Sequence, residues 1–274
     1  MAPVRAVLRA WPLWLLLWVL TLAFALVVVL PITAVLHANL GNSLYAAHLF
    51  DNFDPQWIAE FLFQTGRSPI VALPPLAASP ALAFLLLMTF LSGGVLSVFS
   101  GTAPFWPGCA RNFGRLTLLL LLSLVCYGLA LAANAPLEAL GSKLWGDGME
   151  ERPLVLFAWC RTAFVLLLVL AVNLVFDYAK IRAVADDVRS PLRAAAGAVT
   201  FVLRHPKRTI GTYAIIALFA IALAAVYQAF SSLLPRSSLF TLLLLLVLQQ
   251  AYVAARLFTR LLFFAAQTAL YRSH

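Results

Sequence analysis

Six long apolar runs alternate with shorter polar segments along the chain. A helix needs about 20 apolar residues to cross the hydrocarbon core of a bilayer, and each run is close to or above that length. Because lipid offers the backbone no hydrogen-bond partners, each run is predicted to be helical. The runs cover residues 11–36, 81–101, 116–133, 153–176, 209–230 and 238–255. The pattern predicts an all-α membrane protein with six transmembrane helices, built as one polytopic domain over residues 1–274.

The segments between the runs carry signals of their own. Apolar residues recur at helical spacing after Asp54 until Gly66, which predicts a short amphipathic helix in the membrane interface. A second such helix is predicted over residues 191–203. Residues 134–152 are predicted to form a small acidic loop, and the helix of the sixth run is expected to continue past residue 255 along the interface.

Composition agrees with a membrane protein. The chain is 64% hydrophobic and 11% charged, whereas a soluble domain carries about 25% charged residues. The net charge of +9 would suit a nucleic-acid partner, but the basic residues flank the apolar runs and form no exposed basic domain. We therefore expect the lipid bilayer, and no nucleic acid, as the partner of these charges.

The distribution of basic residues predicts the orientation. The segments before the first run, after the second, after the fourth and after the sixth contain most of the Lys and Arg, and the opposite segments hold only Arg67, Lys143, Arg152 and Arg236. Cytoplasmic loops carry the excess of basic residues in membrane proteins. Both termini are therefore predicted to be cytoplasmic. Frequent Arg, Ala and Leu indicate a GC-rich bacterial genome, which places the protein in a bacterial inner membrane.

The sequence contains none of the short motifs that mark common catalytic or cofactor sites. It has no GxSxG elbow, Walker A loop, HExxH, CxxC or GxGxxG. Cys109, Cys126 and Cys160 match no metal or disulfide spacing. We predict neither an enzyme nor a bound cofactor, with a metal site at His48 and Asp51, together with Asp54 or His37, as a weaker alternative.

Arg161 is the only charged residue well inside a predicted span. A charge at the centre of a span costs about 2.5–3.5 kcal/mol on insertion scales, and less toward an end. The long side chain can reach outward and pair with Glu138, Glu150 or Glu151. The alternative is an anion or substrate contact in a cavity that opens to the outside.

Amide side chains inside predicted spans include Asn173, Gln249 and Gln250. Amides at that depth usually hydrogen-bond across helices. We predict a packing role, with Ser123 and Tyr127 as possible partners, and keep a polar pathway as the alternative.

Small residues recur every fourth position in the second run, at Gly93, Ser97 and Gly101. Small residues let two helix backbones approach closely in lipid. We predict packing within the bundle, with a dimer seam or a hinge as the alternative.

Asp177, Lys180 and Arg182 form a charged elbow at the end of the fourth run. Asp177 is expected to pair with Lys180 on the same helix face. It could instead reach Arg111 or Arg115 across the cytoplasmic rim.

The helix predicted over residues 191–203 is flanked by basic residues. An anionic leaflet attracts each nearby basic residue by about 1 kcal/mol. We predict that this helix lies on the cytoplasmic membrane surface, bound to anionic lipid; a solvated linker and a helix packed under the bundle are the alternatives. The apolar residues expected to face the membrane are Leu192, Val199, Phe201, Val202 and Leu203.

Four segments carry a resemblance to known membrane proteins. They are Gly93-Gly94, Phe113-Gly114-Arg115, residues 176–182 and residues 191–204. Together they resemble a group of uncharacterised bacterial multi-pass integral membrane proteins, loosely similar to the membrane domain attached to some glycerophosphodiester phosphodiesterases. That domain is not the catalytic part of those enzymes, so the resemblance implies a helical membrane fold and no activity.

The sequence predicts a non-enzymatic integral membrane protein, a scaffold or partner subunit of a bacterial envelope complex. A protein partner or a homo-oligomer is compatible with that role. The alternative is a small transporter or lipid-handling protein with an outward-facing cavity near Arg161.

Overall fold

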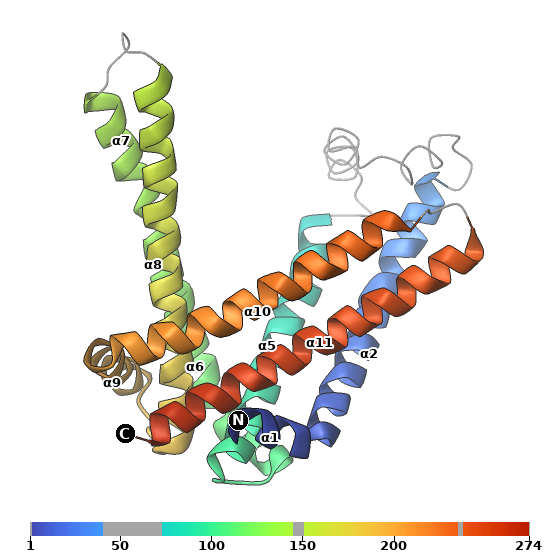
Figure 1. Ribbon diagram of the computed structural model, residues 1–274, viewed down its shortest axis with the longest axis horizontal. Coiled ribbons are helices and arrows are strands. Elements are labelled where there is room, and N and C mark those ends of the chain that lie inside the picture. Colours follow the sequence, from blue (N-terminus) through green and yellow to red (C-terminus); the bar gives the residue numbers. More distant parts are fainter. Residues whose placement is uncertain (1, 41–72, 145–150, 235–237, 274) are drawn as a thin grey trace. The chain divides into compact units, whose positions relative to one another are not determined.

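The computed structural model describes residues 2–40, 73–144, 151–234 and 238–273, and α-helix is the only regular secondary structure there (Figure 1). The all-α class is therefore confirmed. The short helix predicted after Asp54 lies outside the described residues. The helices are α1 (Ala2–Arg9), α2 (Trp11–Leu40), α5 (Leu73–Ser100), α6 (Phe105–Ala132), α7 (Asn134–Leu144), α8 (Glu151–Ala185), α9 (Pro191–Arg204), α10 (Pro206–Leu233) and α11 (Leu239–Arg272).

Six of these helices, α2, α5, α6, α8, α10 and α11, are long and apolar enough to cross a membrane. Each contains all or nearly all of one predicted run. Helix α8 has 35 residues and α11 has 34, so each is about 50 Å long at 1.5 Å per residue. The hydrocarbon core measures about 30 Å, so both helices extend beyond the apolar layer of this multi-pass membrane protein.

One segment that was expected to be a loop is helical. The predicted acidic loop contains α7, because Asn134 and Pro136 are good helix-start residues and the following residues favour helix. The charged elbow belongs to α8, which continues to Ala185. Asp177 pairs with Lys180 three positions later and Arg182 with Asp186 four positions later, while Tyr178 and Ile181 are buried.

The described residues pack into two compact units, and each is described by itself. Unit 2 covers Leu15–Met88, and in it the rings of Phe24 and Phe84 have centroids 5.2 Å apart. Unit 1 combines Met1–Trp14 with Thr89–His274. That the whole chain forms one domain stays a prediction.

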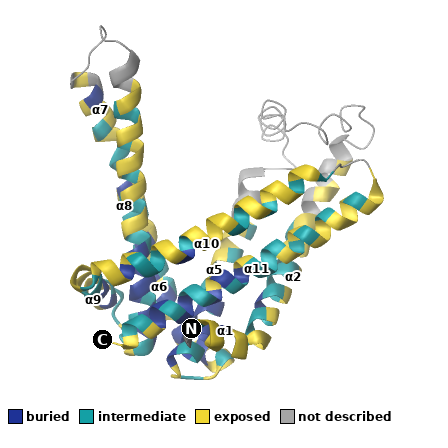
Figure 2. Cartoon of the chain, in the orientation of Figure 1, coloured by how far each residue is buried: buried dark blue, intermediate teal, exposed yellow. Residues whose placement is uncertain are grey.

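The core of unit 1 lies at one end, where α6, α8, α9 and the C-terminal half of α11 meet (Figure 2). Leu116, Tyr178, Ala198 and Leu261, one from each of these helices, are buried there. The distal halves of α8 and α10 instead expose large apolar side chains, which agrees with contact to lipid. We call the buried end the basic end because it contains Arg111, Arg115, Arg182, Arg204 and Arg272.

Helix α1, which the sequence analysis did not predict, packs on α11. Val7 is buried, and Trp14 Nε1 donates a hydrogen bond of 2.7 Å to Ala254 O. The Trp14 and Phe258 rings meet edge to face, with centroids 6.3 Å apart. The N-terminal helix is thereby fixed to the helix that carries the C-terminus.

Candidate functional site

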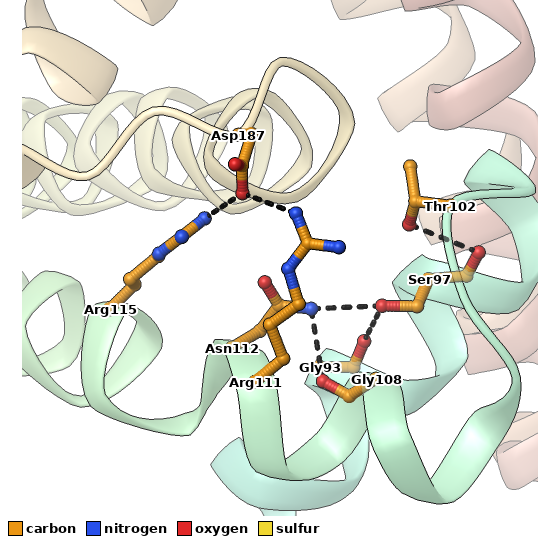
Figure 3. Close-up of polar contacts among 8 residues, drawn as sticks. All are labelled: Gly93, Ser97, Thr102, Gly108, Arg111, Asn112, Arg115 and Asp187. Carbon is orange, nitrogen blue, oxygen red and sulfur yellow. Dashed lines mark hydrogen bonds and ion pairs between the residues drawn. The ribbon is translucent and has the colours of Figure 1, made fainter.

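Asp187 fastens the turn between α8 and α9 to α6. Its backbone has a φ of 53°, in the left-handed region that Asp enters more readily than most residues. Its Oδ1 accepts a hydrogen bond of 2.8 Å from Arg111 Nη2 and a second bond from Arg115 Nη1 (Figure 3). These bonds, from Arg115 first and then Arg111, hold the pKa of the Asp187 carboxyl below its ordinary 3.8.

Asp177 pairs locally within α8. Its Oδ1 lies 3.1 Å from Lys180 Nζ, which is the local pairing expected from the sequence. The alternative partners, Arg111 and Arg115, bind Asp187 instead, because the α8–α9 turn places that carboxylate beside the start of α6. The sequence analysis did not single out Asp187, although it lies between two helix signals where an acid in a turn is common.

Small residues bring α5 and α6 into close contact (Figure 3). Ser97 Oγ donates to Gly93 O at 2.8 Å, and Asn112 Nδ2 donates to Ser97 Oγ at 2.9 Å. An added Cβ at Gly94 would lie 2.7 Å from a backbone oxygen of α6, and one at Gly108 would lie 2.5 Å from Ser97 Cβ. Gly93 and Ser97 therefore face α6 of the same chain. Helix α6 covers the face of α5 that a dimer seam would need.

Gly101 has a different role from the packing expected of it. Its φ is +66°, and it ends α5. Gly101 N bonds to Val98 O at 3.2 Å and Thr102 N to Ser97 O at 3.0 Å, the pair of bonds that defines a Schellman helix end. A left-handed residue is required there, and glycine adopts that conformation at the least cost.

Asn173 links three membrane helices. Tyr127 OH of α6 donates to Asn173 Oδ1 at 3.0 Å, and Asn173 Nδ2 donates to Tyr213 OH of α10 at 2.5 Å. The predicted packing role of Asn173 matches this geometry. Gln249 is exposed and Gln250 is half-buried, and no hydrogen bond among the described residues involves either side chain.

Arg161 is engaged by an acid of α7. Its Nη1 lies 3.1 Å from Glu138 Oε2, one of the three acids that the sequence offered. Phe157, one turn earlier on α8, packs so closely on Gly141 of α7 that a Cβ there would overlap its ring. Helix α7 packs along α8, which brings Glu138 to Arg161. Glu150 lies outside the described residues.

Helix α9 has three distinct faces. Ala194 and Ala198 are buried on the side that contacts α8. Leu192, Val199 and Leu203 form an apolar face that is 66%, 40% and 73% exposed. Phe201, which was expected on that membrane face, instead packs between rings of unit 1, because 100° per residue carries it to the opposite side of the helix from Leu203 and Leu192.

The rings around Phe201 form one wall of a pocket between α8, α9 and the end of α11. Phe201 lies 5.2 Å from Tyr178, 5.3 Å from His205 and 5.1 Å from Tyr271, measured between ring centroids. The pocket has a volume of about 750 Å³. We call it the basic pocket, and it is lined by Arg182, Ala185, Asp186, Gly197, Thr200, Phe201, Arg204, His205, Tyr271 and Arg272.

Close packing fixes the charged groups of the basic pocket. The Arg182 guanidinium lies directly on Gly197, where a Cβ would overlap it. Arg182 Nε is 3.7 Å from Asp186 Oδ2, an ion pair too long for a hydrogen bond, and Tyr271 OH donates to the same oxygen at 2.5 Å. Among the described residues, Arg204 and Arg272 form no ion pair.

Of these pocket residues the sequence analysis singled out Arg182 and, for a place on the membrane surface, Phe201. Gly197 in the middle of a short amphipathic helix was the available signal, since such a glycine weakens a helix unless something approaches it closely. Within the described part of the chain, no three His, Cys, Asp or Glu residues gather as metal ligands; His48 and Asp51 lie outside it. The three Arg side chains that line the basic pocket, Arg182, Arg204 and Arg272, suit it to binding an anion.

Comparisons with protein-family models, with curated proteins and with solved structures find no match for the chain. The resemblance to the membrane domain of glycerophosphodiester phosphodiesterases therefore stays a prediction.

Proposed function

We propose that the protein is a non-enzymatic scaffold or partner subunit in the bacterial inner membrane, with its basic end held on the anionic cytoplasmic leaflet. The observation that carries this proposal is the two-sided packing of α9. One side is buried in unit 1, and the side with Leu192, Val199 and Leu203 is exposed and apolar. An exposed apolar face beside basic residues is typical of a helix lying in a membrane interface.

The chain connections support a position at the membrane boundary. The candidate span of α8 ends at Ala185, and that of α10 begins at Pro206. Helix α9 joins these two ends and has its own axis between them (Figure 1). A segment of this length between two spans stays close to the surface where both emerge.

Charge and apolar area act together on this face. Residues 188–208 contain no acid, and their basic residues are Arg189, Arg193, Arg204, Lys207 and Arg208. An anionic leaflet contributes about 1 kcal/mol for each basic residue near it. Full burial of a Leu side chain contributes about 1.5–3 kcal/mol, so insertion of Leu192 and Leu203 is comparable with the charge contribution.

Fluorescence quenching at single cysteines tests this arrangement. In a background without the native cysteines, an environment-sensitive probe is attached at Leu203 or, as the matched control, at Arg193. We expect a quencher carried on lipid tails to reach the probe at Leu203 more than at Arg193, and more strongly in vesicles that contain anionic lipid. Equal quenching of the Leu203 probe by aqueous iodide in both kinds of vesicle would contradict the proposal.

A lipid-handling role is the second candidate. The outward cavity expected near Arg161 has less support, because Glu138 already binds that guanidinium. The basic pocket, at the other end of α8, favours lipid handling at the basic end instead.

A further inference from the structure

We propose that the basic pocket binds a phosphate monoester, with Arg182, Arg204 and Arg272 around the phosphate and the organic part of the ester in the remaining volume. This inference is independent of whether α9 rests on the membrane, because the pocket lies on a different side of α9 from Leu192, Val199 and Leu203.

The charges that line the pocket suit a doubly charged anion. Arg182, Arg204 and Arg272 contribute three positive charges, and Asp186 contributes one negative charge. A phosphate monoester carries a charge of about −1.5 to −2 at pH 7, which balances this excess. Guanidinium groups also match phosphate geometry, since their N–H groups can bind two oxygens at once.

The Arg donors are available for a ligand. No hydrogen bond among the described residues comes from Arg182, Arg204 or Arg272, and Arg182 Nε is buried without one. The Arg182 guanidinium lies directly on Gly197, and both residues line the pocket. Tyr271 donates a hydrogen bond to Asp186 Oδ2, which lies 3.7 Å from Arg182 Nε, so that N–H forms an ion pair but no hydrogen bond.

The size of the pocket indicates an ester and not a bare ion. Its volume of about 750 Å³ lies within the range of about 300–1,000 Å³ typical of sites for small organic ligands. Phe201 and Tyr271 supply an apolar wall, and Thr200 supplies a hydroxyl on α9. An organic group with a few hydroxyls, such as a glycerol unit, is compatible with this lining.

Two sources can present the same chemistry. A lipid with a terminal phosphate carries it at the membrane surface, and a soluble metabolite carries it in the cytoplasm. The recognised group is the phosphate monoester in both cases, so the experiment includes one ligand of each kind.

The test measures binding to the full chain in nanodiscs of zwitterionic lipid by isothermal titration calorimetry. The probes are glycerol 3-phosphate, a short-chain phosphatidic acid, inorganic phosphate and glycerol 3-sulfate, whose single charge makes it the matched control. We expect at least one phosphate ester to bind saturably and more tightly than the sulfate ester and inorganic phosphate. If both esters bind, the phosphate monoester group is sufficient for recognition. If phosphatidic acid alone binds, the ligand is a lipid.

Variants locate the binding in the pocket. Arg272→Gln and Arg204→Gln each remove a partly exposed donor and should weaken binding on the order of tenfold. Asp186→Asn removes the opposing charge, keeps an acceptor for Tyr271 and should tighten binding. Arg193→Gln removes a charge of α9 outside the pocket and should leave binding unchanged.

The proposal is overturned by any of three results. These are the absence of saturable binding by both phosphate esters, equal affinity for inorganic phosphate and the esters, or binding that Arg272→Gln and Arg193→Gln affect equally. The lipid-quenching experiment on α9 can fail or succeed separately, since its probe at Leu203 is outside the pocket.

Discussion

An alanine at position 94 would place a methyl group between α5 and α6, where the two backbones are in close contact. The new Cβ would lie 2.7 Å from Phe105 O and from Phe105 Cδ2, and closer still to Cys109 Sγ. The Phe105 oxygen belongs to the backbone and cannot turn aside. Gly94→Ala therefore forces the two helices apart. It also disrupts the Ser97–Asn112 hydrogen bond beside them.

The magnitude follows from two opposing effects. Overpacking a well-packed contact costs about 1–3 kcal/mol, while replacing a helical Gly by Ala gains at most about 1 kcal/mol. Gly114 of α6 gives the matched control, because a Cβ there meets nothing within 4 Å. Gly114→Ala has the gain without the cost, so the two variants should differ by about 1–3 kcal/mol in the free energy of unfolding.

Thermal unfolding in detergent, followed by circular dichroism, measures this difference. For a domain of 150–250 residues, about 1 kcal/mol corresponds to a Tm shift of roughly 2–4 °C. Gly94→Ala should lower Tm by several degrees relative to Gly114→Ala. Gly93→Ala, whose Cβ would lie 3.2 Å from Leu116 Cδ1, should fall between them. Equal Tm values for the Gly94 and Gly114 variants would refute the close approach of α5 and α6.

Two further predictions concern the links between helices. Asp187 has a lowered pKa, so its bonds to Arg115 and Arg111 stabilise the protein above pH 3.8 and are lost as the pH falls through the lowered value. Asp187→Asn should therefore reduce Tm at neutral pH, and a pH series should show the difference from wild type vanishing in acid; a constant difference would contradict this. Asn173→Leu leaves two tyrosine hydroxyls without their amide and should lower Tm, at about 0.6–2 kcal/mol for each lost bond. Gln267→Met is the control, since the Gln267 amide is buried without a partner in the described part of the chain, and its loss should be neutral or stabilising.

Local rules account for the elements that were predicted correctly. The apolar runs had to be helices because lipid leaves backbone groups no other partners, and the helix over residues 191–203 was marked by Ser190-Pro191 and Pro206. The same rules misplaced residues 134–144, where acidic and polar residues suggested a loop although Ala and Leu favour helix. The pairing of Asp177 with Lys180 was predictable because both residues lie on one helix face.

The sequence by itself determined the membrane class, the helical fold and six apolar helices, because these depend on composition and on residues a few positions apart. Only the tertiary structure decided which distant residues meet. Arg111 binds Asp187 across 76 positions, and Tyr271 binds Asp186 across 85. Several acids and several basic residues were equally eligible for such pairs, and the choice depends on where each helix ends and which face it turns inward. The basic pocket arises from that choice, since α8, α9 and α11 each contribute an Arg that the sequence places far from the other two.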